Sequence, residues 1–421
     1  MVWQETRLKY VVTQEKNAIV DGPFGSAIST SDYRDNGIPL VRIKNIKPPF
    51  ILEDGLAFIA PLHAKKLERS KIKIDDIVIA KTGATIGKSG INNRIKYGIL
   101  SSSCVKVSID KNRSDHRYYY YTFQTQPFLD NLLLSSNGST RDTINLTELS
   151  NLSCLMPPKD RQIKIADFLD EKCAEIDKLS EDIQKQIDIL NDYKKAVIYK
   201  ALTGGLSNKN ILDTSDGVWK TIPESWSLVD IKYLFEIVKR IAGKEGYDVL
   251  SVTQSGLKVK DITSGEGQLA DDYSKYQLVY PTDYVMNHMD LLTGWVDLSD
   301  KTGVTSPDYR VFRLRDKKNN SLEYFKYVMQ CCYMNRIFYS LGQGVSNLGR
   351  WRLQTSAFNN FKIPVPPLNE QNDIVRRLTE IISDTDRSIE LKEKQLEKIV
   401  DYKKSIIYEY TTGKKRVKGE L

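Results

Sequence analysis

The sequence is poor in the residues on which metal centres and disulfide-rich scaffolds depend. Its three histidines, His63, His116 and His288, lie far apart, so we expect no histidine-based metal site. The five cysteines are an odd number without paired spacing, and Cys331-Cys332 are adjacent. This usage suits neither a usual disulfide nor a zinc knuckle, and it favours reduced thiols in a cytoplasm.

The chain also lacks the long apolar segments that cross membranes. It contains no run of about 18 apolar residues, and its first residues show no basic region followed by an apolar stretch. We therefore expect neither a membrane span nor a signal peptide. A length of 421 residues suits two or three domains, and a net charge of +8 favours an acidic partner, most often a nucleic acid.

What the chain does contain is a long segment that occurs twice. The two copies are 209 residues apart (366 − 157), and no gap is needed between the first matching residues and the last. A repeat of this kind governs the interpretation of the whole fold. The repeated residues are Pro157-Pro158 and Pro366-Pro367, Gln162 and Gln371, Asp192-Tyr193-Lys194-Lys195 and Asp401-Tyr402-Lys403-Lys404, Ile198-Tyr199 and Ile407-Tyr408, and Thr203-Gly204 and Thr412-Gly413.

Each copy predicts one long helix. The prolines stand where a helix can begin, and no further proline or glycine occurs until Gly204 or Gly413, where glycine typically ends a helix. Apolar residues recur every seven positions, which is typical of a coiled-coil seam, and each helix is the nearest candidate partner for the other. The predicted seam positions are Leu169, Ile176, Ile183, Leu190, Val197, Ala166, Cys173, Ser180, Ile187 and Lys194 in the first copy, and Leu378, Thr385, Lys392, Ile399, Ile406, Val375, Ile382, Ile389, Leu396 and Lys403 in the second.

The segments around the first helix also resemble each other. Asp76-Ile77-Val78 followed by Gly87 corresponds to Asp283-Tyr284-Val285 followed by Gly294, at an offset of 207 (283 − 76). We therefore expect an α+β fold, in which two similar mixed α/β domains alternate with two long helices that pair as an antiparallel coiled coil about a pseudo-two-fold axis. The expected boundaries are 1–156 for the first domain, 157–203 for the first helix, 204–218 for a linker, 219–365 for the second domain, 366–412 for the second helix and 413–421 for a basic tail.

Within the domains, two kinds of element are expected. Residues 76–80 predict a buried strand, because they are almost continuously apolar. Residues 118–134 and 324–341 predict aromatic-rich helices, in which Tyr119 and Tyr324 belong to the core rather than to a base-stacking surface.

No catalytic motif is complete. Residues 83–89 resemble a phosphate-binding loop but have three residues between the glycines where four are needed. Lys47-Pro48-Pro49-Phe50 resembles the base-binding motif of amino-methyltransferases, yet an ammonium cannot accept hydrogen bonds from a base. With scattered histidines, no serine, histidine and acid cluster can be assembled. The sequence therefore indicates binding rather than catalysis.

The helix starts carry a family resemblance. The two long helices alternate with two variable domains, and they open with Pro157-Pro158-Lys159-Asp160-Arg161-Gln162 and Pro366-Pro367-Leu368-Asn369-Glu370-Gln371. In these features the chain resembles the specificity subunit of type I restriction–modification systems along essentially its whole length. The second copy is similar to the family's usual sequence. The first departs from it at Lys159-Asp160-Arg161, which leaves the contact made there open.

The resemblance implies two target-recognition domains, each reading one half of a split sequence in double-stranded DNA. It implies that the helices are a spacer and a docking surface for two methyltransferase subunits, with restriction subunits as optional further partners. It also implies no active site and no cofactor in this chain. Two alternatives stay open: a DNA methyltransferase or nuclease whose motifs have drifted, and a coiled-coil scaffold whose domains bind proteins.

The candidate DNA-binding residues follow from the chemistry of base edges and phosphates. Arginine and lysine suit guanine, asparagine and glutamine suit adenine, and phosphate contacts position the protein without specifying sequence. The candidates are Arg42, Lys44, Asn45, Lys81, Thr82, Lys88 and Arg141 in the first domain, and Asn287, His288, Gln343, Ser346, Asn347, Arg350 and Arg352 in the second.

Overall fold

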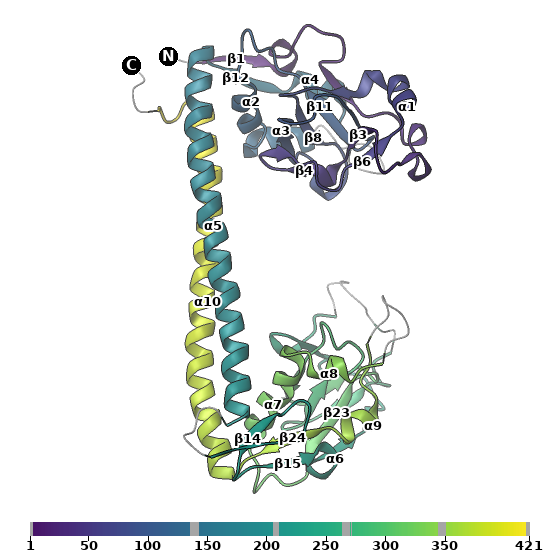
Figure 1. Ribbon diagram of the computed structural model, residues 1–421, viewed down its shortest axis with the longest axis vertical. Coiled ribbons are helices and arrows are strands. Elements are labelled where there is room, and N and C mark those ends of the chain that lie inside the picture. Colours follow the sequence, from purple (N-terminus) through teal and green to yellow (C-terminus); the bar gives the residue numbers. More distant parts are fainter. Residues whose placement is uncertain are drawn as a thin grey trace. The chain divides into compact units, whose positions relative to one another are not determined.

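The structure is a computed structural model that describes residues 3–134, 143–204, 210–262, 270, 272–343 and 351–417 (Figure 1). The chain forms two compact units. Unit 1 consists of Met1–Gln184 with Lys394–Leu421, and unit 2 consists of Lys185–Glu393. Each unit therefore contains one globular domain and a part of both long helices.

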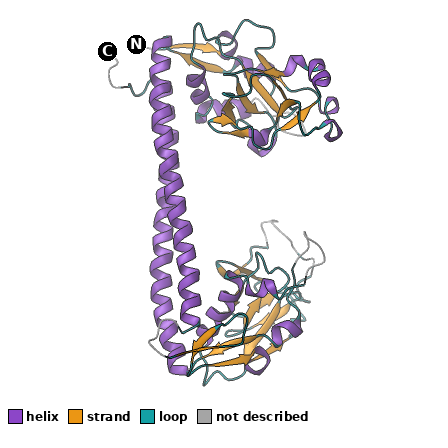
Figure 2. Cartoon of the chain, viewed as in Figure 1, coloured by secondary structure: helices purple, strands orange, loops and turns teal. Residues whose placement is uncertain are grey.

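The domain of unit 1 is built on two mixed sheets, with helices packed around them (Figure 2). Its first strand, β1 (Gln4–Arg7), pairs with β12 (Ser153–Met156), which leads into the first long helix. In spatial order the larger sheet contains β2 (Ile19–Asp21), β11 (Cys104–Val107), β8 (Ile77–Ala80), β9 (Ser89–Ile91), β5 (Phe50–Ile51) and β4 (Ile46–Lys47). The smaller sheet contains β6 (Ala57–Ile59), β3 (Ile38–Val41), β10 (Gly98–Leu100) and β7 (Lys71–Ile72), and the helices are α1 (Pro61–Lys66), α2 (His116–Thr122), α3 (Gln126–Leu134) and α4 (Leu146–Asn151).

The strand predicted at residues 76–80 is the centre of this domain. All four residues of β8 are buried, and successive side chains of a strand point to opposite faces of its sheet. Ile77 and Ile79 pack in the cluster that contains the tyrosines of α2, whereas Val78 and Ala80 pack in a cluster with Val41 of β3. An apolar run without alternation is therefore explained by burial on both faces.

Unit 2 repeats this plan with smaller sheets. Its sheet contains β16 (Phe235–Val238), β23 (Arg310–Leu314), β20 (Tyr284–Met286) and β21 (Val296–Leu298). The pairs are β13 (Ile211–Asp213) with β14 (Thr221–Pro223), β15 (Ser227–Asp230) with β24 (Lys362–Val365), β17 (Leu250–Thr253) with β18 (Gly256–Val259), and β19 (Gln277–Val279) with β22 (Gly303–Thr305). The helices are α6 (Ile231–Leu234), α7 (Leu322–Met334), α8 (Ile337–Ser340) and α9 (Thr355–Asn359).

The predicted long helices are present. They are α5 (Lys159–Leu202) and α10 (Leu368–Thr411), and both begin directly after the repeated prolines. Gly204 and Gly413 follow their ends with φ values of +83° and +73°, a left-handed conformation that glycine adopts without strain.

Within each unit, α5 and α10 are in contact and run in opposite directions (Figure 1). In unit 1, Asp177 of α5 pairs with Lys403 of α10 at 2.6 Å, and the rings of Phe168 and Tyr410 lie 4.3 Å apart at a tilt of 36°. In unit 2, Lys194 pairs with Asp386 at 2.6 Å, and Gln186 accepts from Lys392. Every predicted seam position is buried or half-buried, so the seven-residue pattern identifies the side of each helix that is least exposed.

Three sequence-based expectations need correction in detail. The aromatic segment 118–134 forms two helices rather than one, because Pro127 removes a backbone donor near the start of α3. The corresponding segment of unit 2 breaks at Arg336, whose φ is +54°. The expected linker 204–218 contains strand β13, while residues 205–209 lie outside the described part of the chain.

The remaining expectations concern the cysteines, two core tyrosines and membrane-spanning helices. All five cysteines are buried free thiols, as expected from their spacing. Tyr119 and Tyr324 are fully buried, which confirms their assignment to the core. Among the described residues, no helix is long and apolar enough to cross a membrane.

Candidate nucleic-acid interface

The same two segments meet in each domain, and both carry candidate residues. In unit 1, the carbonyl of Lys81, directly after β8, accepts a hydrogen bond from the N–H of Ile144 at 3.0 Å. In unit 2, the carbonyl of His288, shortly after β20, accepts from the N–H of Leu353, also at 3.0 Å. The loop after the central buried strand thus lies beside the segment that precedes α4 or α9. Loops held on a buried strand in this way are typical positions for binding residues.

In unit 1, the loop after β8 is partly exposed and partly anchored. The Lys81 ammonium lies 2.5 Å from Asp21, which also pairs with Arg69 at 3.2 Å. Thr82 forms a β-bridge with Thr143, and Lys88 is half-buried at the start of β9. Residues 83–85 are exposed and form a short 3-10 helix. Lys81 is therefore paired with a carboxylate within the fold, and its side chain is 16% exposed.

Arg42, Lys44 and Asn45 form a second group in unit 1. Arg42 donates to the carbonyl of Gly55 at 3.0 Å, and Lys44 is exposed. Asn45 is 0% exposed, and its amide oxygen accepts from the N–H of Arg42 while its nitrogen donates to backbone carbonyls. Asn45 therefore holds this loop together and presents no free edge to a base.

The two groups of unit 1 flank one turn, residues 101–103. The N–H of Ser101 donates to the carbonyl of Val41 at 2.8 Å, and the N–H of Lys81 donates to the carbonyl of Ser103 at 2.7 Å. The loops after β3 and β8 are therefore neighbours in the fold, although about 40 residues separate them in the sequence.

In unit 2, Asn287 and His288 also have structural contacts. Asn287 is half-buried, its side-chain oxygen accepts from the N–H of Met289 at 3.3 Å, and its carbonyl accepts from the Tyr333 hydroxyl at 2.8 Å. His288 is 7% exposed. Burial, with the nearby charges of Arg310 and Arg352, lowers the pKa of the His288 imidazole to about 3. The ring is therefore neutral near pH 7.

Gln343 and Arg352 are the exposed candidates of unit 2. Their backbones form an antiparallel bridge, with hydrogen bonds of 3.0 Å and 3.2 Å, and both side chains are exposed. The segment between them carries Ser346, Asn347 and Arg350, which lie outside the described residues, as does Arg141 of unit 1.

Arg310 contacts the residues that directly follow Arg352, and the sequence analysis did not identify it. Its side chain is buried and donates to the carbonyl of Leu353 at 3.1 Å and to the Thr355 hydroxyl at 3.3 Å. The guanidinium also lies 4.5 Å from the centre of the Phe358 ring, and burial lowers the pKa of Arg310 to about 10. Arg310 is the first residue of β23, and the same strand carries the exposed Arg313, so residue type alone did not distinguish the buried arginine.

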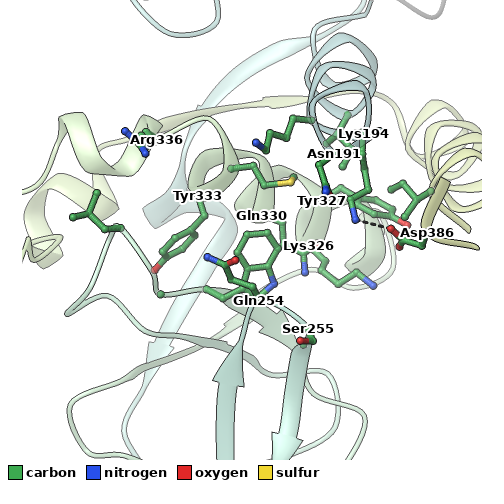
Figure 3. A pocket seen from close by; sticks show the side chains of 18 residues that line it. Asn191, Lys194, Gln254, Ser255, Lys326, Tyr327, Gln330, Tyr333, Arg336 and Asp386 are labelled. Atoms are coloured by element: carbon green, nitrogen blue, oxygen red, sulfur yellow. Dashed lines mark hydrogen bonds and ion pairs between the residues drawn. The ribbon is translucent and has the colours of Figure 1, made fainter. Parts of the chain in front are cut away.

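Each unit also has a cavity between its domain and its two helices. In unit 2 the cavity measures about 650 Å³, and Figure 3 shows Lys194 and Asp386 on the helices facing Tyr327, Gln330 and Tyr333 of α7. The cavity of unit 1 measures about 960 Å³ and contains the equivalent pair, Lys403 and Asp177. The other carboxylates and cations that line the two cavities differ. The repeat therefore preserves the position of the cavity and its lysine–aspartate pair, but not the charge of its lining. Among the described residues, no group of three or more histidines, cysteines and acids could hold a metal ion.

The sequence model of the type I restriction modification DNA specificity domain matches this chain twice, at residues 22–188 and 223–400. The chain belongs to this family. Each match covers most of one globular domain and extends into the long helix that follows it. The specificity domain therefore occurs once in each unit, together with the equivalent loop contacts described above.

Individual relatives agree with this assignment. The type I restriction enzyme MjaVIII specificity subunit of Methanocaldococcus jannaschii is 28% identical over 390 residues, which are 87% of this chain and 85% of that protein. Among solved structures, a chain from work on complex assembly and conformational transition of the type I R-M system has a TM-score of 0.63 at 13% identity and covers 97% of both chains. The HsdS subunit from Thermoanaerobacter tengcongensis has a TM-score of 0.50 at 13% identity, covering 98% of this chain and 97% of that one. At these identities the two structures support the fold alone.

Proposed function

We propose that this protein is the non-catalytic DNA-specificity subunit of a type I restriction–modification complex, and that each of its domains reads one half of a bipartite target. The observation that carries the proposal is the double match to the DNA specificity domain, once per unit. Two copies of one domain with different exposed loops suit two different half-sites.

The exposed side chains are the best candidates for contact with DNA. Gln343 and Arg352 lie beside each other, and their side chains can donate to adenine and guanine edges in the major groove. In unit 1, the exposed Lys44 and the half-buried Lys88 suit phosphates. Asn45 and His288 act indirectly in this proposal, because their side chains lie within the fold. The Asn45 side chain and the His288 backbone carbonyl hold their loops in place.

The helices are proposed to set the spacer and to dock two methyltransferase subunits, which restriction subunits can join. Both helices carry large apolar side chains that remain exposed after α5 and α10 have packed, and such side chains are common at protein interfaces. The repeat preserves two of them, because Tyr193 is 50% exposed in unit 2 and its counterpart Tyr402 is 57% exposed in unit 1. The further exposed residues are Leu179 and Val400 in unit 1 and Ile189 and Leu391 in unit 2.

A domain exchange tests the proposal. The complex is reconstituted with its methyltransferase subunits, and the methylated positions on a genomic DNA library are mapped. Replacing residues 219–365 by the matching domain of a relative should change one half of the target and leave the other half unchanged. A change in both halves would contradict the assignment of one domain to each half-site.

The same reconstitution addresses the alternatives. The chain alone should transfer no methyl group and cut no DNA, whereas a drifted enzyme would do so without partner subunits. A complex that assembles but shows no sequence preference would instead support a protein-binding scaffold.

A further inference from the structure

Two buried glutamines make the same contacts in the two units. Gln162 and Gln371 are 0% and 1% exposed, and each is the fourth residue of its long helix. In unit 1, the Gln162 Oε1 accepts from the N–H of Asp115 at 2.9 Å, and its Nε2 donates to the carbonyl of Pro157 at 2.7 Å. In unit 2, Gln371 Oε1 accepts from the N–H of Ser321 at 2.8 Å, and its Nε2 donates to the carbonyl of Pro366 at 2.8 Å.

The acceptor contact completes the start of a domain helix. Asp115 and Ser321 are the N-cap residues of α2 and α7, and their own side chains accept from N–H groups of the first turn. In a capping box, the glutamate or glutamine three residues after the N-cap accepts from the N-cap N–H. Tyrosine occupies that position in both helices, as Tyr118 and Tyr324. The long helix therefore supplies the missing acceptor from outside.

In both units, the hydroxyl of this tyrosine donates to a backbone carbonyl of another chain segment instead. The Tyr324 hydroxyl donates to the carbonyl of Pro364 at 3.0 Å, and the Tyr118 hydroxyl donates to the carbonyl of Thr411 at 2.9 Å and approaches that of Leu155 at 3.4 Å. A glutamine at the third position of α2 or α7 could not make these contacts to the ends of the domain and the helix. The contacts of the tyrosine and of the distant glutamine thus connect the domain helix, the end of the domain and the long helix.

In unit 2, α7 connects this junction to the loop that carries candidate DNA-binding residues. The helix spans 13 residues, and its Tyr333 hydroxyl donates to the carbonyl of Asn287. Gln330, one turn earlier, donates to the carbonyl of Val296 at 3.2 Å, and Figure 3 shows both side chains on α7. Because a helix is stiff over three to four turns, a shift at its start moves the loop at its other end.

We infer that Gln162 and Gln371 are positioning residues for DNA recognition: each completes, from the long helix, the capping box of a domain helix and so fixes the domain on that helix. The inference rests on the proposed function for its effect on DNA, whereas the capping contact itself can be tested without DNA.

The first experiment measures thermal unfolding of the full chain carrying Q371M, Q371E or Q395M. Methionine keeps the length of glutamine but leaves a buried N–H and a buried carbonyl unpaired, so Q371M should lower the Tm by roughly 5 °C. Gln395 is exposed on the same helix, so Q395M should leave the Tm unchanged.

Q371E separates hydrogen bonding from packing. Its carboxylate can accept from the Ser321 N–H but opposes the Pro366 carbonyl, whereas the protonated acid can donate to that carbonyl as glutamine does. The Tm deficit of Q371E relative to the parent chain should therefore shrink as the pH falls from 8 to 5, while the deficit of Q371M stays constant. A Q371M chain with the parent Tm, or a pH-independent deficit for Q371E, would overturn the capping contact.

The second experiment measures methylation by the reconstituted complex on duplexes whose spacer is correct, or longer or shorter by one base pair. Q371M should reduce the preference for the correct spacer while leaving the preferred half-site sequences unchanged. If the parent complex methylates all three spacer lengths equally, the proposed function is refuted, but the Tm difference between Q371M and the parent chain still supports the capping contact. A Q371M complex that is less stable but keeps the parent spacer preference would refute the positioning role.

Discussion

At the scale of single residues, exposure divides the candidate side chains into two groups. Arg352 and Gln343 are exposed on paired backbone segments, so their side chains are accessible in the fold as it stands. Asn45 and His288 have suitable chemistry but lie within the fold. Residue type could be predicted from the sequence, whereas this division depends on contacts between distant segments, such as the carbonyls of Leu52 and Asp54 that accept from Asn45.

We expect R352A to weaken recognition of one half-site only. Losing a two-pronged contact to a guanine costs about 1–3 kcal/mol, or roughly 5- to 150-fold in discrimination. The measurement is the binding of the reconstituted complex to targets with single substitutions in either half-site. R376A, which removes an exposed arginine of α10, should have no such effect. Equal losses in both half-sites would argue against separate recognition by the two domains.

We also expect His288 to make unit 2 sensitive to acid. Its pKa is lowered to about 3 in the fold, against an ordinary value near 6.5, because of burial and the charges of Arg310 and Arg352. The unfolded chain therefore binds a proton more readily, and stability is lost as the pH falls from about 6.5 towards 3. Over that window the Tm of H288L should fall less than the Tm of the parent chain. Parallel Tm curves would show that His288 does not carry this proton linkage.

At the scale of elements, the repeat made the long helices predictable and local signals fixed their ends. The seven-residue pattern identified the buried side of α5 and α10, because burial against a partner helix imposes that period. The break between α2 and α3 was missed in the sequence analysis, although Pro127 was a local signal for it. The capping of α2 by Gln162 was not, because a contact 47 residues away along the chain leaves no local pattern.

Gly204 offers a test of how α5 ends. It has a φ of +83°, and a Cβ there would lie 2.2 Å from Pro223, so G204A should suffer both backbone strain and a clash. Gly243 has a φ of +70° with open space around it, and Gly217 has open space without a positive φ. G243A should therefore cost only the left-handed strain, about 1–2 kcal/mol, and G217A should cost least. Urea unfolding of the three variants should follow this order, and a G204A chain as stable as G217A would disprove it.

At the scale of the whole molecule, the order of domain, helix, domain and helix was visible in the sequence. The helix segments and the domain segments each occur twice, at offsets of nearly equal size. The extent of the two units was less visible. Each unit takes a part of both helices, so that residues 394–421 belong with residues 1–184. Residues far apart in the chain, such as Tyr118 and Thr411, thus meet in one core, and no local pattern indicates this.

The spacer hypothesis is tested where both helices pass from one unit to the other. One heptad inserted between Gln184 and Lys185 and another between Glu393 and Lys394 keeps the seam in register. Seven residues add about 10 Å of helix at roughly 1.5 Å per residue, which equals about three base pairs of duplex. Three base pairs also turn a half-site by roughly a third of a turn about the duplex axis, so methylation of the longer target should be slower than for the parent pair.

We expect the complex with both heptads to lose the original target and to prefer one with a longer spacer between unchanged half-sites. The control places the same seven residues after Leu202 alone. Ile198, Ala201 and Leu202 are buried in the core of unit 2, so this insertion lengthens only the connection to β13 and should leave the target as it was. Mapping of methylated sites distinguishes the two variants. If the double insertion still methylates the original target, the helices do not set the spacer; if it changes a half-site instead, the helices take part in reading bases.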